Sequence, residues 1–323
     1  MKPVPAPLLT VHDRRGLVFG YELPTCTPVT LGSAPASAQP VWLHFNLTDA
    51  RARAWLSEEA GLPEVALEVM LDSQTRARLQ RLPTGVVAVL TDLQHGFRGD
   101  PEGFADLRVY VEPGRVITAR RRPLETVDTL RLAFDAGSAL PTPSHWLEQY
   151  VESLADNFAR VVHELVDQVD ELEDEIVLGG GLERRATLAS IRRLLVRFRR
   201  HVSADRTALA PLRARDDRDQ GPMRHALEHL DGIAQDIELV HERVRLLQEE
   251  VAALLAESTN RNLYVLSIVT TVLLPTTVVT GLWGMNVGGM PWQDDGHGFL
   301  WALLAVLASV VLSLALLRGS RVL

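Results

Sequence analysis

The sequence has little cysteine, and its last sixth has almost no charge. Cys26 is the only cysteine among 323 residues, which excludes a disulfide framework and fits a chain that faces the cytosol. No apolar run of signal-peptide length follows Lys2, so no secretory signal is expected. Beyond Arg261 the only charged side chains are Asp294, Asp295, Arg318 and Arg321. We therefore expect a soluble, mildly acidic part followed by a lipid-embedded end.

The first part of the chain lacks a Gly-rich phosphate loop, which argues against ATP-driven pumping. It also lacks the nucleophile elbow of α/β-hydrolases. Short β-forming runs alternate there with helical patterns. The predicted strands are 16–23, 41–47, 85–93 and a hairpin over 107–121 that turns at Glu112–Arg115, and Thr48–Asp49 is predicted to cap a helix. An α/β domain with a mixed sheet is predicted over residues 1–143.

Residues 144–221 have helical character. Two helices, 144–178 and 182–212, are predicted to form an antiparallel hairpin around the glycines 179–181. The first helix ends in acidic residues and the second is rich in arginine, so their opposite charges are expected to face each other. With an acidic neighbour and membrane spans in the same chain, the arginines do not indicate a nucleic-acid partner.

A third helix is predicted to run from 222 to 283 without a break, over ~90 Å. No Pro or Gly lies between Ile233 and Pro275. The apolar residues of this helix recur strictly every seven positions. That repeat indicates a helix that packs along a partner, either within one subunit or in a parallel oligomer. One apolar heptad set is Met223, Leu230, Ile237, Val244 and Val251, and the other is Ala226, Ile233, Val240, Leu247 and Leu254.

Two uncharged segments, 263–283 and 299–317, are each long enough to cross a bilayer. Arg261 precedes the first, Arg318 and Arg321 follow the second, and the loop 284–298 contains no Lys or Arg. The positive-inside rule therefore places both ends, including the tail 318–323, in the cytoplasm and the loop outside.

The first span has a face of leucine, hydroxyl and small residues that recurs every three or four positions. That face suits a narrow pore where several copies meet at an axis. Equally, its hydroxyls can bond their own backbone carbonyls, and its glycine can pack against a neighbouring helix. Its members are Asn260, Leu263, Leu266, Thr270, Leu274, Thr277 and Gly281.

A zinc-like motif lies at the start of the third helix. His225, Glu228 and His229 match H-x-x-E-H, the pattern of inverted zinc proteases, in which Glu228 would act as the base. His225 and His229 share a helix face and could instead hold a regulatory metal. An ordinary helix surface is the interpretation that we favour, because no third ligand is evident in the sequence.

Gly284, Met285 and Asn286 follow directly after the first of the two terminal spans. This Gly-Met-Asn triplet, with the long helix and α/β domain before it, resembles the CorA superfamily of divalent-cation channels and transporters. The longer stretch GMNVGGMPW (284–292) resembles the zinc-transporting ZntB branch. Magnesium members usually have an acidic residue soon after the loop proline, whereas Trp292 follows Pro291 here.

The resemblance implies a funnel-shaped homopentamer in a bacterial inner membrane, with first spans lining the pore and one Asn286 per subunit at the outer mouth. It implies transport of Zn²⁺, with Mg²⁺ or a broad Co²⁺, Ni²⁺ and Cd²⁺ range as the alternative, and protons as a candidate coupling ion. Amide oxygens can bond the waters of a hydrated cation, and Asp294, Asp295 and His297 would raise the cation concentration outside. No tightly bound cofactor and no catalytic activity are expected.

Overall fold

The chain folds into two compact units, Met1–Gln248 and Glu249–Leu323. The computed structural model describes residues 15–29, 31, 39–73, 76–100, 102–180, 184–213, 222–285 and 296–319. Asn286, Asp294 and Asp295 lie outside these described residues. One helix, α6 (Pro222–Trp283), begins in the first unit and ends in the second.

The first unit is built on a six-stranded sheet with the strand order β1-β2-β6-β5-β4-β3. The predicted mixed sheet is confirmed, because β2 and β6 pair in parallel and the other neighbours pair antiparallel. Strand β3 was not predicted: it is short, polar and at the sheet edge, and so lacks an alternating apolar pattern. The strands are β1 (Leu17–Glu22), β2 (Val41–Asn46), β3 (Arg78–Arg81), β4 (Val86–Leu93), β5 (Phe104–Glu112) and β6 (Arg115–Arg120).

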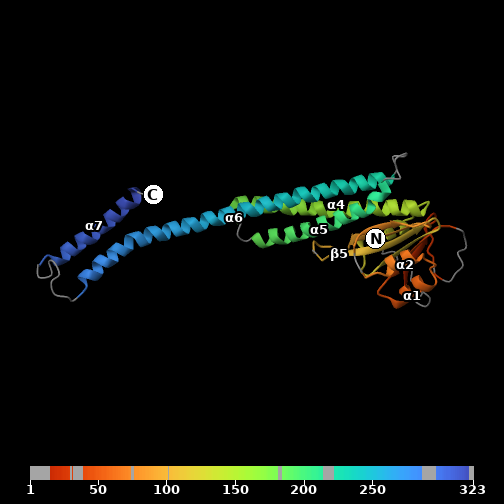
Figure 1. The fold of residues 1–323 in the computed structure, drawn as a ribbon. Helices are drawn as coiled ribbons and strands as arrows, with labels where there is room; N and C mark the ends of the chain where they lie inside the picture. The colour runs from red at the N-terminus through yellow and green to blue at the C-terminus, as the bar shows by residue number, and fades with distance from the viewer. Residues whose placement is uncertain are drawn as a thin grey trace, which may run out of the picture. The chain divides into compact units, whose positions relative to one another are not determined.

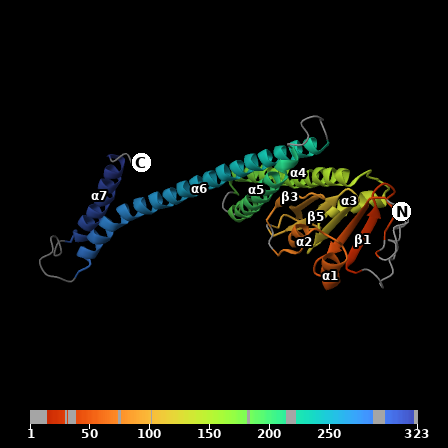
Figure 2. The ribbon, with the colours of Figure 1, turned by 45° about the vertical axis from the view of Figure 1, so that its right-hand side comes forward.

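Helices cover both faces of this sheet (Figures 1 and 2). Successive residues of β2 point to opposite faces. Phe45 stacks on Trp55 of α1 (Ala50–Glu58), with ring centroids 4.7 Å apart, and α2 (Glu64–Leu71) contributes to the same core. On the other face, the rings of Trp42 and of Trp146 in α4 (Pro143–Glu175) have centroids 5.2 Å apart, and α3 (Glu125–Asp135) contacts the same Trp42 ring. Asp49 caps α1 by accepting a hydrogen bond from the backbone N–H of Arg51, as predicted.

The long helices pack against the sheet and against one another within the first unit. Helix α4 continues into a π-helical turn, η1 (Ile176–Gly180), and α5 (Arg185–Arg213) and α6 follow. The heptad positions of α6 from Ala226 to Leu247 are buried by the subunit itself. The repeat therefore reflects packing within one subunit, which was one of the two interpretations left open by the sequence.

The expected pairing of the acidic end of α4 with the arginines of α5 is only partly right. Glu175 does pair with Arg184, just before α5, at 2.7 Å. Asp170 and Glu173, however, both pair with Arg243 of α6. The physical reason is that α6 supplies charged partners to both preceding helices. The α5 arginines that reach α6 include Arg199, which pairs with Glu238, and Arg206, which pairs with Asp231.

The second unit contains the end of α6 and helix α7 (Gly298–Gly319). Both helices are long and apolar enough to cross a membrane. In the core helix of a soluble protein such a segment would be buried, but no residue in the most apolar window of α6 is buried, and only 6% of the window in α7 is. Exposed apolar surface of this extent is expected where lipid or another subunit covers it.

Candidate cation pathway on α6

Helices α6 and α7 each have one half-buried stripe in the second unit. These positions recur every three or four residues, as expected where two helices pack against each other. On α6 they include Tyr264, Ile268, Val272, Thr276, Val279 and Trp283. On α7 they are mostly small residues, which allow close approach of two helices: Gly298, Ala302, Ala305, Ser309 and the buried Ser313.

The face predicted to line a pore lies on the opposite side of α6. At 3.6 residues per turn, its mean direction is about 180° from that of the half-buried stripe. Leu263, Leu266 and Leu274 are 56%, 60% and 61% exposed. Asn260, Thr270, Thr277 and Gly281 are exposed as well. All seven residues thus share a face that nothing in the described part of the chain covers, and their role in a pore stays a prediction.

The threonine hydroxyls on this face bond to their own helix. Thr270 Oγ1 donates to the Leu266 carbonyl at 2.9 Å, and Thr277 Oγ1 donates to the Leu273 carbonyl at 2.8 Å. A hydroxyl has one proton and two lone pairs. Because the proton is directed at the backbone, the oxygen presents its lone pairs outward. Each hydroxyl is therefore an outward-facing acceptor, the polarity that suits the waters around a cation.

The start of the Gly-Met-Asn triplet closes the last turn of α6. Helix α6 ends at Trp283, the Gly284 N–H donates to the Thr280 carbonyl at 2.9 Å, and the Met285 N–H donates to the Leu282 carbonyl at 3.3 Å. The exposed His297 lies just before α7, and its carbonyl accepts from the N–H groups of Leu300 and Trp301. The triplet thus begins where the helical hydrogen bonding of the first span ends.

The histidines of the zinc-like motif face α4. His229 Nδ1 lies 3.3 Å from Glu152 Oε1 and 3.8 Å from Asp156 Oδ1, and His225 Nδ1 lies 3.9 Å from Glu152 Oε2. Glu228, the residue with the role of base in the protease interpretation, instead pairs with Arg224 at 2.8 Å. Glu152 and Asp156 cannot be recognised as partners from the sequence, because no local pattern connects them to histidines 69 to 77 positions away.

A buried polar cluster beneath α4 and α5 also gives no signal in the sequence. Asp92 accepts hydrogen bonds from Thr126 Oγ1 at 2.8 Å and from Tyr150 Oη at 3.2 Å, and burial raises the pKa of Asp92 to about 7. Asp205 accepts from the Thr91 N–H at 3.0 Å, and burial raises its pKa well above the usual range. These groups bond the sheet to α3, α4 and α5, so the cluster is structural in the single chain.

The family model described as CorA-like Mg²⁺ transporter protein matches residues 37–318. The chain belongs to the CorA family. Within it, the chain is 29% identical over 290 residues to the zinc transport protein ZntB of Yersinia enterocolitica, covering 87% of this chain and 88% of that protein.

The relative CmaX is similar to this chain both in sequence and in its solved structure. The chain is 31% identical over 316 residues to the divalent cation transporter CmaX of Pseudomonas aeruginosa, covering 91% of this chain and 93% of that protein. The solved structure of full-length CmaX matches with a TM-score of 0.79 and 29% identity, over 97% of this chain and 100% of that one. Family membership and the two unburied apolar helices identify the chain as a membrane protein of metal-ion transport.

Proposed function

We propose that the chain transports divalent cations, Zn²⁺ above all, through a pore on the axis of a homopentamer in a bacterial inner membrane, with both termini in the cytoplasm. The observation that carries the proposal is the exposed stripe of leucine, threonine and glycine on α6, opposite the half-buried stripe of the same helix. A surface that faced only lipid would gain nothing from hydroxyl oxygens whose lone pairs point outward. A stripe of this composition is expected where copies of the helix surround water.

Gly281 supports the same arrangement. A Cβ at this position would meet no atom within 4 Å in the single chain, so the subunit's own packing does not require glycine. Glycine is useful where another backbone approaches closely or where a carbonyl must stay accessible. Both conditions hold at an axis where five copies of α6 converge.

At the outer mouth, Asn286 follows Gly284 and Met285 at the end of the first span. Five amide oxygens would accept hydrogen bonds from the waters of a hydrated dication, without the cost of stripping them. Asp294, Asp295 and His297 in the outer loop would raise the local cation concentration. Binding of this kind is weak enough for the ion to move on, as conduction requires.

Deeper in the pore the exposed face alternates in character. Thr277 and Thr270 would form acceptor rings, whereas Leu274 and Leu266 would form hydrophobic constrictions that gate by dewetting. Leu263 and then Asn260 lie at the inner end of the same face. None of these seven positions is a carboxylate. Selectivity among cations would therefore rest on the hydration of the ion, the electric field of the protein and the gating of the pore.

Zinc is favoured over magnesium by the 29% identity to a zinc transport protein and by Trp292, which stands where magnesium members usually have an acidic residue. Mg²⁺, or a broader range with Co²⁺, Ni²⁺ and Cd²⁺, is the second candidate, supported by the broader name of the CmaX relative. The transported ion is cargo, and the proposal includes no tightly bound cofactor. Protons are the candidate coupling ion.

The test is flux into liposomes that contain the purified full-length chain. Zn²⁺, Mg²⁺, Ni²⁺ and Co²⁺ are compared with and without a pH gradient, using an internal metal-sensitive dye. Asn286→Ala should abolish flux or its selectivity, whereas Gln293→Ala, which removes an amide from the same loop, should leave both intact. Equal flux in both variants, as a membrane scaffold would give, contradicts the proposal, and a pH-gradient effect identifies proton coupling.

A further inference from the structure

Four side chains that can bind metals face one another across α4 and α6 in the first unit. Glu152 and Asp156 are one helical turn apart on α4, and His225 and His229 are one turn apart on α6, so each pair shares a helix face. The ligand atoms of Glu152, Asp156 and His229 all lie within 4.8 Å of one another. We propose that these residues form a binding site for Zn²⁺ or a similar transition metal, separate from the transport pathway.

The distances match those of a zinc site. Zinc–ligand bonds are ~2.0–2.2 Å long and tetrahedral, which places neighbouring ligand atoms roughly 3.3–3.6 Å apart. His229 Nδ1 is 3.3 Å from Glu152 Oε1 and 3.8 Å from Asp156 Oδ1, so an ion between them requires only small side-chain movements. His225 Nδ1 faces the other oxygen of Glu152 at 3.9 Å, from which a rotation would make it the fourth ligand.

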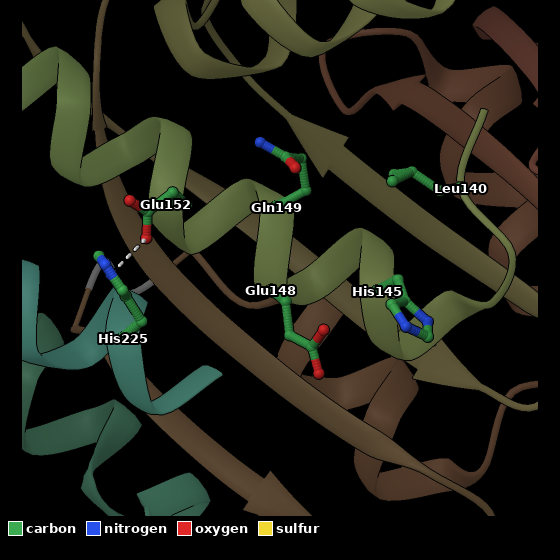
Figure 3. A pocket seen from close by; sticks show the side chains of 6 residues that line it. All are labelled: Leu140, His145, Glu148, Gln149, Glu152 and His225. Carbon is green, nitrogen blue, oxygen red and sulfur yellow. Dashed lines mark ion pairs between the residues drawn. The ribbon is translucent and has the colours of Figure 1, made fainter. Parts of the chain in front are cut away.

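An ion can reach this site from solvent. A hollow of about 380 Å³ adjoins it, and Figure 3 shows Glu152 and His225, which line it, pointing toward each other from α4 and α6. His229 and Glu152 are each 31% exposed, and Asp156 is 66% exposed. The ligands are thus held by the packed helices while their coordinating atoms remain accessible.

The donor set favours zinc over magnesium or calcium. Two imidazole nitrogens with two carboxylate oxygens are typical zinc ligands, whereas Mg²⁺ and Ca²⁺ prefer oxygen ligands in larger numbers. Two carboxylates also balance the charge of a divalent ion when the histidines are neutral. Ordinary ion pairing between protonated histidine and carboxylate is the competing explanation of the same distances, and it requires no metal.

Metal bound here would bridge two helices whose ligands are 77 positions apart in the sequence. It would stabilise the folded first unit, because the assembled ligand set does not exist in the unfolded chain. At a free zinc concentration 100-fold above the dissociation constant, the unfolding temperature should rise by about 5–10 °C for a unit of this size. Ion pairing alone predicts no zinc-dependent shift.

The experiment counts zinc on the detergent-solubilised full-length chain, in the Asn286→Ala background so that the outer mouth does not contribute. His229→Ala and Glu152→Gln should each lower the bound zinc by one per subunit, or weaken binding at least 10-fold. His163→Ala and His241→Ala are the matched controls: each removes another histidine from α4 or α6, and neither should change the count. Mg²⁺ should not compete at equal concentration.

Cobalt provides a second readout, because tetrahedral Co²⁺ has visible absorption bands that an adventitious surface ion lacks. These bands should appear with the Asn286→Ala parent and both controls, and disappear in His229→Ala. If the zinc count, the cobalt spectrum and the unfolding temperature are the same in His229→Ala as in the controls, the site does not exist. Because none of these measurements involves flux, the site can fail while the transport proposal stands, and the reverse.

Discussion

Asp92 provides the sharpest test of the electrostatics in the first unit. The carboxyl is fully buried, and burial raises its pKa to about 7 despite the hydrogen bonds that it accepts from Leu93, Thr126 and Tyr150. In the unfolded chain the same group ionises near pH 4. The folded state therefore binds more protons than the unfolded state between about pH 4 and pH 7, so this group stabilises the fold below pH 4 and loses that contribution as pH rises to 7.

The change to make is Asp92→Asn, which keeps an acceptor oxygen for Leu93 and Thr126 and does not titrate. Each pH unit in this window corresponds to 1.36 kcal/mol, so the wild-type chain should lose about 4 kcal/mol relative to the variant across the whole window. For a unit of this size, that is about 3–5 °C in unfolding temperature per pH unit. The asparagine variant should be the more stable of the two at pH 7.5.

The measurement is thermal unfolding of the full-length chain in detergent from pH 5 to pH 7.5, followed by the fluorescence of the buried Trp42 and Trp146. Taking the difference between wild type and variant removes the opposing effect of His201, whose burial lowers its pKa to about 4. Glu171→Gln, which alters an exposed carboxylate of α4, serves as control and should follow the wild type. A wild-type-minus-variant difference that stays flat with pH would refute the reasoning.

Three further predictions concern the α6 stripe and the core. Thr277→Val should lower zinc flux in liposomes by about 10-fold through loss of an acceptor ring, whereas Thr276→Val, which loses the same kind of hydroxyl from the half-buried side of α6, should not. Gly281→Leu should reduce the oligomer measured by light scattering in detergent, whereas Gly232→Leu should leave it intact, although both positions are open in the single chain. Trp146→Ala should destabilise the first unit by about 3–5 kcal/mol in denaturant unfolding, because its indole fills the core without a hydrogen bond in the described structure.

Most of the secondary structure was predictable because its signals are local. Strands β2 and β4 consist of compact β-forming runs, Asp49 stands directly before the first helical turn, and the apolar repeat of α6 is unbroken from Ala226 to Leu247. Strand β3 gave no such signal, because an edge strand of two arginines, a leucine and a glutamine is defined by its neighbour β4 rather than by its own pattern.

The candidate sites were predictable only to the same local extent. The exposed stripe from Asn260 to Gly281 follows from helical spacing alone. The partners of His225 and His229 do not, because Glu152 and Asp156 come beside them only through the packing of α4 on α6. The buried Asp92 was missed for the same reason, since its burial depends on helices that follow it in the sequence by more than 30 residues.

The heptad repeat of α6 does not by itself indicate an oligomer. A seven-residue repeat is equally satisfied by a partner helix of the same subunit or of another one. Since the positions from Ala226 to Leu247 are buried within the first unit, they are not available to a second copy. Most of the apolar residues of α6 that remain exposed lie in the second unit and include Leu254, Leu263, Leu266 and Leu274, whereas Leu239 and Leu246 are exposed in the first unit. Most of the driving force for assembly should therefore come from the apolar end of α6 in the second unit, which is why Gly281 rather than a heptad residue is the informative position to change.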